Sequence, residues 1–249
     1  MNKLNRLLRQ DEVNEPGVIK ETVEQMRLFD SSVVCGLRCR EWEYGWGIGN
    51  LLKFLKDKNL KDIKWLDIGS ASSTLPFYLA SLGIDISVYE FPEYQDFFMK
   101  HSVFPPVTFI PIEHYERSIS DAWNDLGYHI NADTSSFDVV TCISVLEHLP
   151  HHEETNLIKE IARVIKSNGL LFFTTDVNQV RNYHPHLRAG NNKWHIYDRQ
   201  DLQKDVLNPC VQYGLELIGN QIEYVPGLEE NKLEHTNLHN ILSFFMRKI

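Results

Sequence analysis

The sequence has little cysteine and no excess of positive charge, and each shortage argues against a class of protein. Four cysteines are scattered through 249 residues. Cys35 and Cys39 form one C-x₃-C, but no second pair at zinc-finger spacing accompanies it, so we expect buried reduced thiols and no metal. Lys and Arg number 25 against 34 Asp and Glu, a net charge of −9. Such a chain is poorly suited to gripping phosphate backbones, so we expect no nucleic-acid partner.

Long apolar runs are also missing. No run approaches the ~20 residues that a membrane span requires, and residues 1–16 are too polar for a signal peptide. We therefore expect a cytoplasmic protein without a membrane span. The sequence has no internal repeat and no low-complexity tract. Its length and its 43% hydrophobic content suit one α/β domain with a sizeable core.

The most informative stretch has the pattern strand, tight turn, helix, strand. An apolar strand (63–68) runs into Gly69 and a cluster of small residues, and a helix (75–82) then leads to a second strand (84–89) that ends on Glu90. Strands joined through a helix pair in parallel, so the turn lies at the carboxyl edge of the sheet, where open α/β folds bind ligands. Small residues let a ligand approach the backbone, and a strand-end acid can accept hydrogen bonds from two ribose hydroxyls. The combination predicts a nucleotide-like cofactor.

Apolar strands continue to alternate with helices until a polar insertion at 177–198, and two strands close the chain. Such an insertion after a strand's carboxyl end is typical of substrate loops. We expect a doubly wound, Rossmann-like α/β fold with seven strands, mostly parallel, and one antiparallel strand near the C-terminus. The expected strands are 63–68, 84–89, 107–112, 137–143, 169–176, 215–225 and 241–248, and the expected helices are 18–29, 50–58, 75–82, 94–101, 119–126 and 153–166, with a further helix opening near Asp198.

Three matches make the chain from Trp42 to Ile249 resemble the class I S-adenosylmethionine-dependent methyltransferases, in particular the small-molecule branch. They are LDIGSASS (Leu66–Ser73), the strand-end Glu90, and the long segment FDVVTCISVLEHLPHHEETNLIKEIARVIKSNGLLFFTT. The resemblance implies S-adenosylmethionine as cofactor and a methyltransferase domain over 46–249, preceded by an N-terminal helical cap at 1–45.

Two positions of the turn depart from the family's glycine pattern. Ala71 and Ser73 stand where the family usually has its second and third glycines. Alanine fits such a turn if its φ is negative, and Ser70 and Ser73 could donate hydrogen bonds to the cofactor's carboxylate. The departure also motivates an alternative, a catalytically silent relative that binds the cofactor or a partner without transfer.

The resemblance further assigns roles to individual residues. Asp67 would organise the turn, Glu90 would take the ribose hydroxyls, and Phe91 would pack on the adenine. Glu113 would accept from the adenine amino group, and Ser144 would close the site. The implied cofactor-binding residues are Asp67, Gly69, Ser70, Ala71, Glu90, Phe91, Glu113 and Ser144. The aromatics Trp42, Tyr44 and Trp46 precede the helix that leads into the first parallel strand, and Tyr44 either packs on the sheet edge or covers the cofactor.

Methyl transfer to a hydroxyl benefits from a general base, whereas an amine needs less help. His148 follows the fourth of the seven expected strands on the substrate side, and His184 and His195 lie in the insertion, so these three are the candidate bases. A divalent metal held by Asp176 and insertion histidines is an alternative that no ligand spacing supports.

The residues after the strand 137–143 argue against two classes of methyl acceptor. They lack the N-P-P-Y sequence found in enzymes that methylate amino groups of nucleic acids or glutamine side chains of proteins. Pro209–Cys210 lies too late in the chain to be the nucleophile pair of enzymes that methylate cytosine. We expect Pro209–Cys210 to be a loop with a buried thiol. The sequence therefore favours a hydroxyl or amino group of a small molecule or saccharide. A nicotinamide dehydrogenase is disfavoured because the turn lacks G-x-G-x-x-G.

Overall fold

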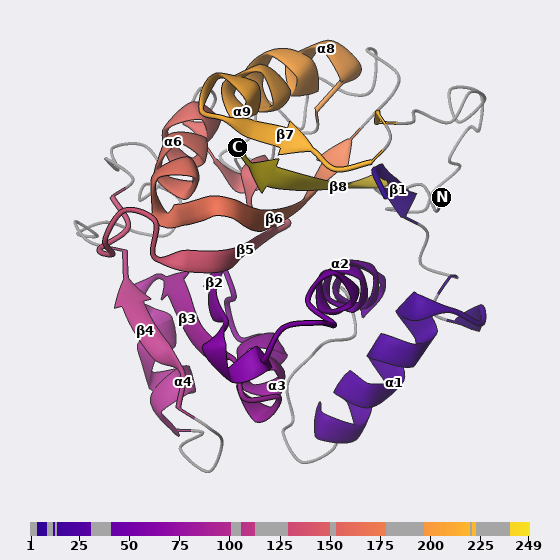
Figure 1. Ribbon diagram of the computed structural model, residues 1–249, viewed down its shortest axis with the longest axis vertical. Coiled ribbons are helices and arrows are strands. Elements are labelled where there is room, and N and C mark those ends of the chain that lie inside the picture. The colour runs from indigo at the N-terminus through magenta and orange to yellow at the C-terminus, as the bar shows by residue number, and fades with distance from the viewer. Residues whose placement is uncertain are drawn as a thin grey trace.

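A computed structural model gives the fold (Figure 1) and describes residues 4–8, 12, 14–30, 41–100, 106–112, 129–149, 153–177, 197–219, 221–222 and 240–249. Its strands are β1 (Arg6–Leu8), β2 (Lys64–Ile68), β3 (Asp85–Glu90), β4 (Thr108–Pro111), β5 (Phe137–Ile143), β6 (Ile165–Val177), β7 (Leu215–Leu217) and β8 (Asn240–Lys248). Its longer helices are α1 (Val18–Asp30), α2 (Glu41–Phe54), α3 (Leu75–Ser81), α4 (Gln95–Lys100) and α6 (Glu154–Val164). The short elements are η3 (Leu60–Asp62), η4 (Pro92–Tyr94), η5 (Leu146–His148), α8 (Arg199–Asp201), η6 (Leu202–Leu207) and α9 (Asn208–Gln212).

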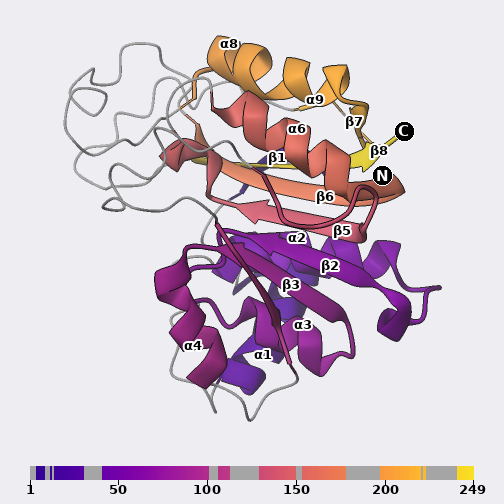
Figure 2. The same cartoon turned by 90° about the vertical axis from the view of Figure 1, so that its left-hand side faces the viewer.

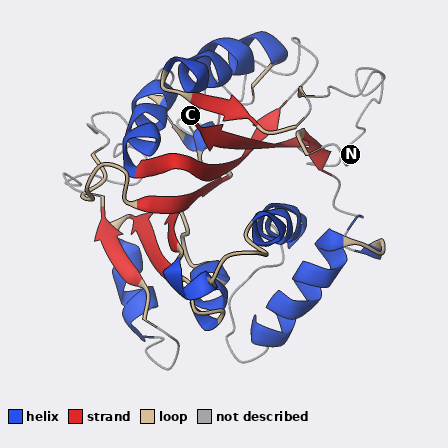
Figure 3. Cartoon of the chain, viewed as in Figure 1, coloured by secondary structure: helices blue, strands red, loops and turns tan. Residues whose placement is uncertain are grey.

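The strands form one sheet in the order β1-β8-β6-β5-β2-β3-β4, and β7 also pairs with β8 (Figure 3). Strands β2 to β6 are parallel to one another, whereas β8 runs antiparallel to β6, β7 and β1. The order reverses between β2 and β5, so the carboxyl ends of these two strands flank the point where open α/β sheets bind ligands. The expected mostly parallel sheet with antiparallel C-terminal strands is confirmed.

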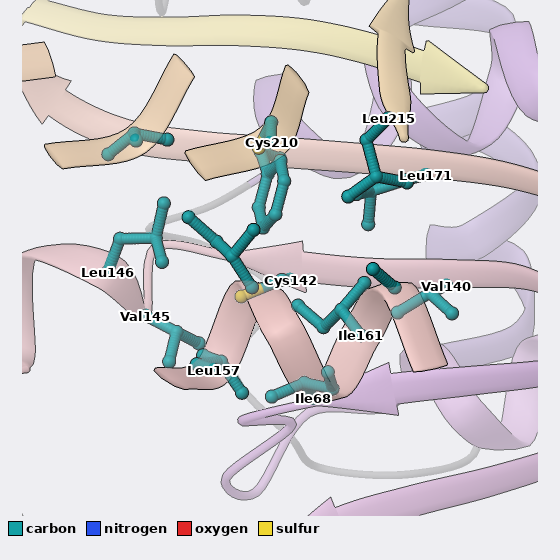
Figure 4. Packing of buried hydrophobic residues seen from close by; sticks show 14 of the residues in the cluster. Ile68, Val140, Cys142, Val145, Leu146, Leu157, Ile161, Leu171, Cys210 and Leu215 are labelled. Carbon is teal, nitrogen blue, oxygen red and sulfur yellow. The ribbon is translucent and has the colours of Figure 1, made fainter. Parts of the chain in front are cut away.

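Helices cover both faces of the sheet, as its continuously apolar strands require. Trp65 packs in the core beneath α1, α2 and α3, and its neighbour Leu66 packs in the core beneath α6 and α9. Figure 1 and Figure 2 show α2 and α6 on opposite sides of β5 and β6. Figure 4 shows the second core, in which Cys142 of β5 and Cys210 of α9 are both buried. The expectation of buried thiols is confirmed for these two cysteines, while Cys35 and Cys39 lie outside the described residues.

Helix α2 begins nine residues before the predicted 50–58, because its glycines are contact points rather than breaks. A Cβ at Gly47 would lie 2.1 Å from Phe172 Cε1, and one at Gly49 would lie 2.4 Å from Thr22 Oγ1. Glycine therefore lets α2 pack closely on β6 and on α1. Trp42 and Trp46, which the sequence pattern places before the helix, lie inside it.

Three further boundaries differ from prediction. Helix α6 ends at Val164 rather than at 166, and β6 starts at once at Ile165 rather than at 169. Asn168, within β6, has a left-handed φ of 65°. Gly169 is needed for space, since a Cβ there would meet Ile165 Cγ1 at 2.6 Å. Pro209–Cys210 opens α9 rather than a loop, because proline is well accommodated in a first helical turn. Strand β7 ends at Leu217 rather than at 225.

Strand β1 was not predicted, because three residues carry too little periodicity to be recognised. The buried Asn5 holds it to the sheet: its Nδ2 donates to Ile218 O at 3.1 Å, and its Oδ1 accepts from Phe245 N–H at 2.7 Å. The predicted helix 119–126 lies outside the described residues. Among the described helices, none combines the length and the apolar character needed to cross a membrane.

Candidate functional site

The turn after β2 is held in a left-handed conformation at two positions. Gly69 has φ +73°, and a Cβ there would lie 2.3 Å from Val145 Cγ2, so glycine fits this turn closely against the end of β5. Ala71 has φ 46°. The condition under which alanine fits the turn without penalty, a negative φ, is therefore not met, and the residue occupies a conformation that costs a non-glycine residue roughly 1–2 kcal/mol.

Glu90 supplies what holds Ala71 there. Its carboxylate is 3% exposed at the carboxyl end of β3. Ala71 N–H donates to Glu90 Oε2 at 2.6 Å, and Phe91 N–H donates to Oε1 at 2.8 Å. One side chain thus ties the turn after β2 to the start of η4. Burial raises the pKa of Glu90 to about 7, against the opposing effect of these two hydrogen bonds and with smaller contributions from Asp67 and Glu93.

Asp67 organises the same turn from beneath. Ser70 Oγ donates to its Oδ2 and Thr141 Oγ1 donates to its Oδ1, each at 2.5 Å, and Trp65 Nε1 in turn donates to Thr141 Oγ1 at 3.0 Å. Burial raises the pKa of Asp67 to about 6, although the two hydroxyls act to lower it. The residue is therefore a structural anchor between β2, its turn and β5.

The hydroxyls that begin α3 differ in what they offer a ligand. Ser70 donates inward to Asp67, and Ser73 Oγ accepts from Leu75 N–H at 3.0 Å. The buried Thr74 hydroxyl has no hydrogen-bond partner among the described residues. A buried hydroxyl without a partner costs stability unless something else pairs with it. Thr74, which the sequence pattern did not single out, therefore carries a hydroxyl with unused hydrogen-bonding capacity next to Ser73.

A second left-handed residue that is not glycine lies across from the turn, at the end of β5. Ser144 has φ 50°, and its N–H donates to Thr174 O and to Thr174 Oγ1. Its hydroxyl donates to Glu43 Oε2 at 2.8 Å, and Thr174 Oγ1 donates to the same oxygen. Glu43 is fully buried on α2. Sequence reasoning selected the neighbouring Tyr44 instead, and no local pattern marks Glu43, because its contacts with Ser144 and Thr174 are long-range.

The other site residues expected from the sequence lie in different parts of the fold. Phe91 is buried in the core beneath α6, and Tyr44 is half-buried on α2 against the opposite core. His148 is half-buried at the end of η5, three residues beyond Val145, which contacts the Gly69 turn. Asp176 is buried at the carboxyl end of β6. Glu113, His184 and His195 lie outside the described residues.

A family model described as "Methyltransferase domain" matches residues 43–208, about two thirds of the chain. The chain belongs to this family. The match spans the turn after β2, Glu90 and the segment from β5 to β6, so the resemblance to class I S-adenosylmethionine-dependent methyltransferases is confirmed. S-adenosylmethionine is therefore the cofactor that the site has to fit. The described residues fit this cofactor. The buried carboxylate of Glu90, the turn that Gly69 holds close to Val145, and the Thr74 hydroxyl, which has no partner among the described residues, all lie at or just after the ends of strands β2 and β3, at the carboxyl edge of the sheet.

Known proteins agree with this assignment. A ubiquinone biosynthesis O-methyltransferase of Xanthomonas oryzae pv. oryzae is 28% identical over 118 residues, which cover 47% of this methyltransferase-family chain and 44% of the relative. The chain thus spans less than half of that relative's length. A TehB-like methyltransferase structure from Corynebacterium glutamicum aligns with a TM-score of 0.52 and 16% identity over 92% of this chain and 97% of its own. The [4+2]-cyclase SpnF aligns with a TM-score of 0.54 and 15% identity, over 93% and 95%. At such identities the two structures establish the fold.

The strain at Ala71 gives a first prediction. Ala71→Gly should raise the free energy of unfolding by roughly 0.5–1 kcal/mol, because glycine adopts positive φ without the Cβ penalty. Ala80→Gly, the same change inside α3, should lower it by about 1 kcal/mol. Urea unfolding of both variants measures the two signs. An Ala71→Gly variant that loses as much stability as Ala80→Gly would contradict the assigned conformation.

The two raised pKa values predict how stability of the ligand-free protein depends on pH. Asp67 and Glu90 keep their protons in the folded state to about pH 6 and 7, whereas in the unfolded chain they lose them near 4. The unfolded state therefore binds fewer protons between these limits, and the stabilising contribution present below pH 4 is lost as pH rises to 7. Each group should contribute up to about 3 kcal/mol to this loss. Asp67→Asn should flatten the profile by its share, and an unchanged slope would contradict the assignment.

Proposed function

We propose that the protein transfers a methyl group from S-adenosylmethionine to a hydroxyl or amino group of a small molecule or saccharide. The observation that carries the proposal is the arrangement of Glu90. A carboxylate offers about four acceptor sites, and Glu90 uses one on each oxygen for Ala71 N–H and Phe91 N–H. One site per oxygen is left, which matches the two hydroxyls of a ribose. The backbone bonds also fix the direction in which those sites point.

The other turn residues act around that contact. Asp67 keeps the turn in place, and Gly69, Ser70 and Ala71 line the methionine and ribose portion with their backbone. Phe91 and Glu113 serve the adenine, Tyr44 covers the site, and Ser144 closes it on the β5 side. Ser73 and Thr74 are the hydroxyls placed to donate to the cofactor's carboxylate, since the Ser70 proton is directed to Asp67.

The bound cofactor supplies a methyl group on a positively charged sulfur, which leaves as a neutral thioether. The chain's task is then to align the acceptor atom and to exclude water. An acceptor hydroxyl must also lose its proton. His148, on the turn after β5, is positioned to take that proton, with His184 and His195 of the insertion as the other candidates. An amine acceptor needs only a neutral nitrogen and a route for its proton to leave.

The acceptor class rests on two supports. The acidic chain argues against a nucleic acid, and the similar protein from Xanthomonas is named for O-methylation in ubiquinone biosynthesis. A phenolic or sugar hydroxyl is therefore the first acceptor to test. The second candidate function is cofactor binding without methyl transfer. The strained Ala71 favours it, as does the existence of a similarly folded protein named as a cyclase.

Titration calorimetry with S-adenosylmethionine and with its demethylated product tests the proposal at its first step. Wild-type protein should bind both, and Glu90→Ala should weaken binding by about 1–3 kcal/mol, because two hydrogen bonds to a charged group are lost. Glu93→Ala removes an exposed acid three residues away and should leave affinity unchanged. Melting curves establish that each variant is folded.

The outcomes separate the alternatives. No binding by wild-type protein at millimolar cofactor contradicts both the enzyme and the cofactor-binding alternative. Unchanged affinity in folded Glu90→Ala removes the ribose role. Binding without product, across catechols, sugars and amines tested with labelled cofactor, favours the silent alternative.

A further inference from the structure

Two hydroxyls donate to the carboxylate of Glu43. Thr174 Oγ1 accepts from Ser144 N–H at 3.0 Å, so its own proton points away from that bond and toward Glu43 Oε2. Ser144 Oγ donates its proton to the same oxygen at 2.8 Å. Glu43 Oε2 therefore accepts two hydrogen bonds. The three residues come from α2, the end of β5 and β6, and Glu43 and Ser144 are 101 residues apart in sequence.

The backbone of Ser144 needs such support. With φ 50° Ser144 adopts a left-handed conformation, which a non-glycine residue populates about 5- to 30-fold less than the right-handed one. This conformation turns the chain out of β5 and into η5, which carries His148. The next residue, Val145, contacts the Gly69 turn. The conformation of Ser144 therefore determines where one side of the cofactor site lies.

We propose that Glu43 is a positioning residue that holds Ser144 in the left-handed conformation and so fixes the β5 side of the cofactor site. The geometry parallels that of Glu90 and Ala71 on the opposite side, where a buried glutamate also restrains a left-handed residue that is not glycine. Glu43 acts through Ser144, so it does not have to touch the cofactor. The functional consequence rests on the proposed function, whereas the conformational role does not.

A matched pair of variants at Ser144 isolates the backbone effect. Ser144→Ala and Ser144→Gly remove the same hydroxyl and the same bond to Glu43, but only glycine adopts φ 50° without a penalty. Affinity for the demethylated cofactor, measured by calorimetry, should fall at least fivefold further in Ser144→Ala than in Ser144→Gly. Equal affinities in the two variants would overturn the proposal.

Variants at Glu43 test the support itself. Glu43→Ala removes the acceptor and should weaken binding about tenfold or more, whereas Glu43→Gln keeps an acceptor oxygen and should lose less than threefold. In the double variant Glu43→Ala/Ser144→Gly, most of the affinity lost in Glu43→Ala should return. A residue that merely fills the core, or that contacts the ligand directly, gives no such rescue, and its absence would overturn the proposal.

A stability cycle decides the same question without the cofactor. The loss of unfolding free energy caused by Glu43→Ala should be smaller in the Ser144→Gly background than in wild type, because the strain that Glu43 restrains is then gone. Additive losses would overturn the positioning role. If wild-type protein binds no cofactor, the proposed function fails while this cycle still tests Glu43. If Glu43→Ala does not fold, the Ser144 pair gives the answer.

Discussion

The site depends on buried glutamates that hold strained turns at the carboxyl edge of the sheet. Glu90 accepts from Ala71 N–H and Phe91 N–H, and Glu43 accepts from Ser144 and Thr174. Each restrains a left-handed residue that is not glycine, which by itself favours another conformation. Strain of this kind persists only where surrounding contacts over-determine the backbone, and it is common at functional sites. The two restrained turns stand on β2 and β5, at the point where the strand order reverses.

Burying a carboxylate costs free energy, and the contacts that stabilise Glu90 differ from those that stabilise Asp67. Glu90 is held by backbone N–H groups and Asp67 by two hydroxyls, yet burial still raises both pKa values. On the other face of the sheet, Tyr197 donates to Glu154 Oε1 at 2.7 Å beneath α6. Raised pKa values combined with restrained turns at the switch point are what distinguish the cofactor edge. A site rich in acceptors also suits a cofactor that carries positive charge on sulfur and nitrogen.

Much of the fold could be predicted from the sequence, because its strands are apolar runs separated by turn residues. The seven expected strands all form, and Glu90 stands at the end of the second one as predicted. The start of α2 could not be predicted, since Gly47 and Gly49 look like helix breakers until Phe172 and Thr22 are seen against them. Strand β1 depends on a long-range pairing with β8, which no local pattern encodes.

The backbone conformations around the candidate site could not be predicted from the sequence. The strand-end acid and the small-residue turn are visible in the sequence, whereas the sign of φ at Ala71 and the support from Glu43 arise from tertiary contacts. A crystal structure with the demethylated cofactor tests the role of Glu90 most directly. Both ribose hydroxyls should lie about 3 Å from the two Glu90 oxygens, with Ala71 N–H and Phe91 N–H still donating to them. A ribose bound elsewhere, or an Ala71 N–H turned away from Glu90, would contradict it.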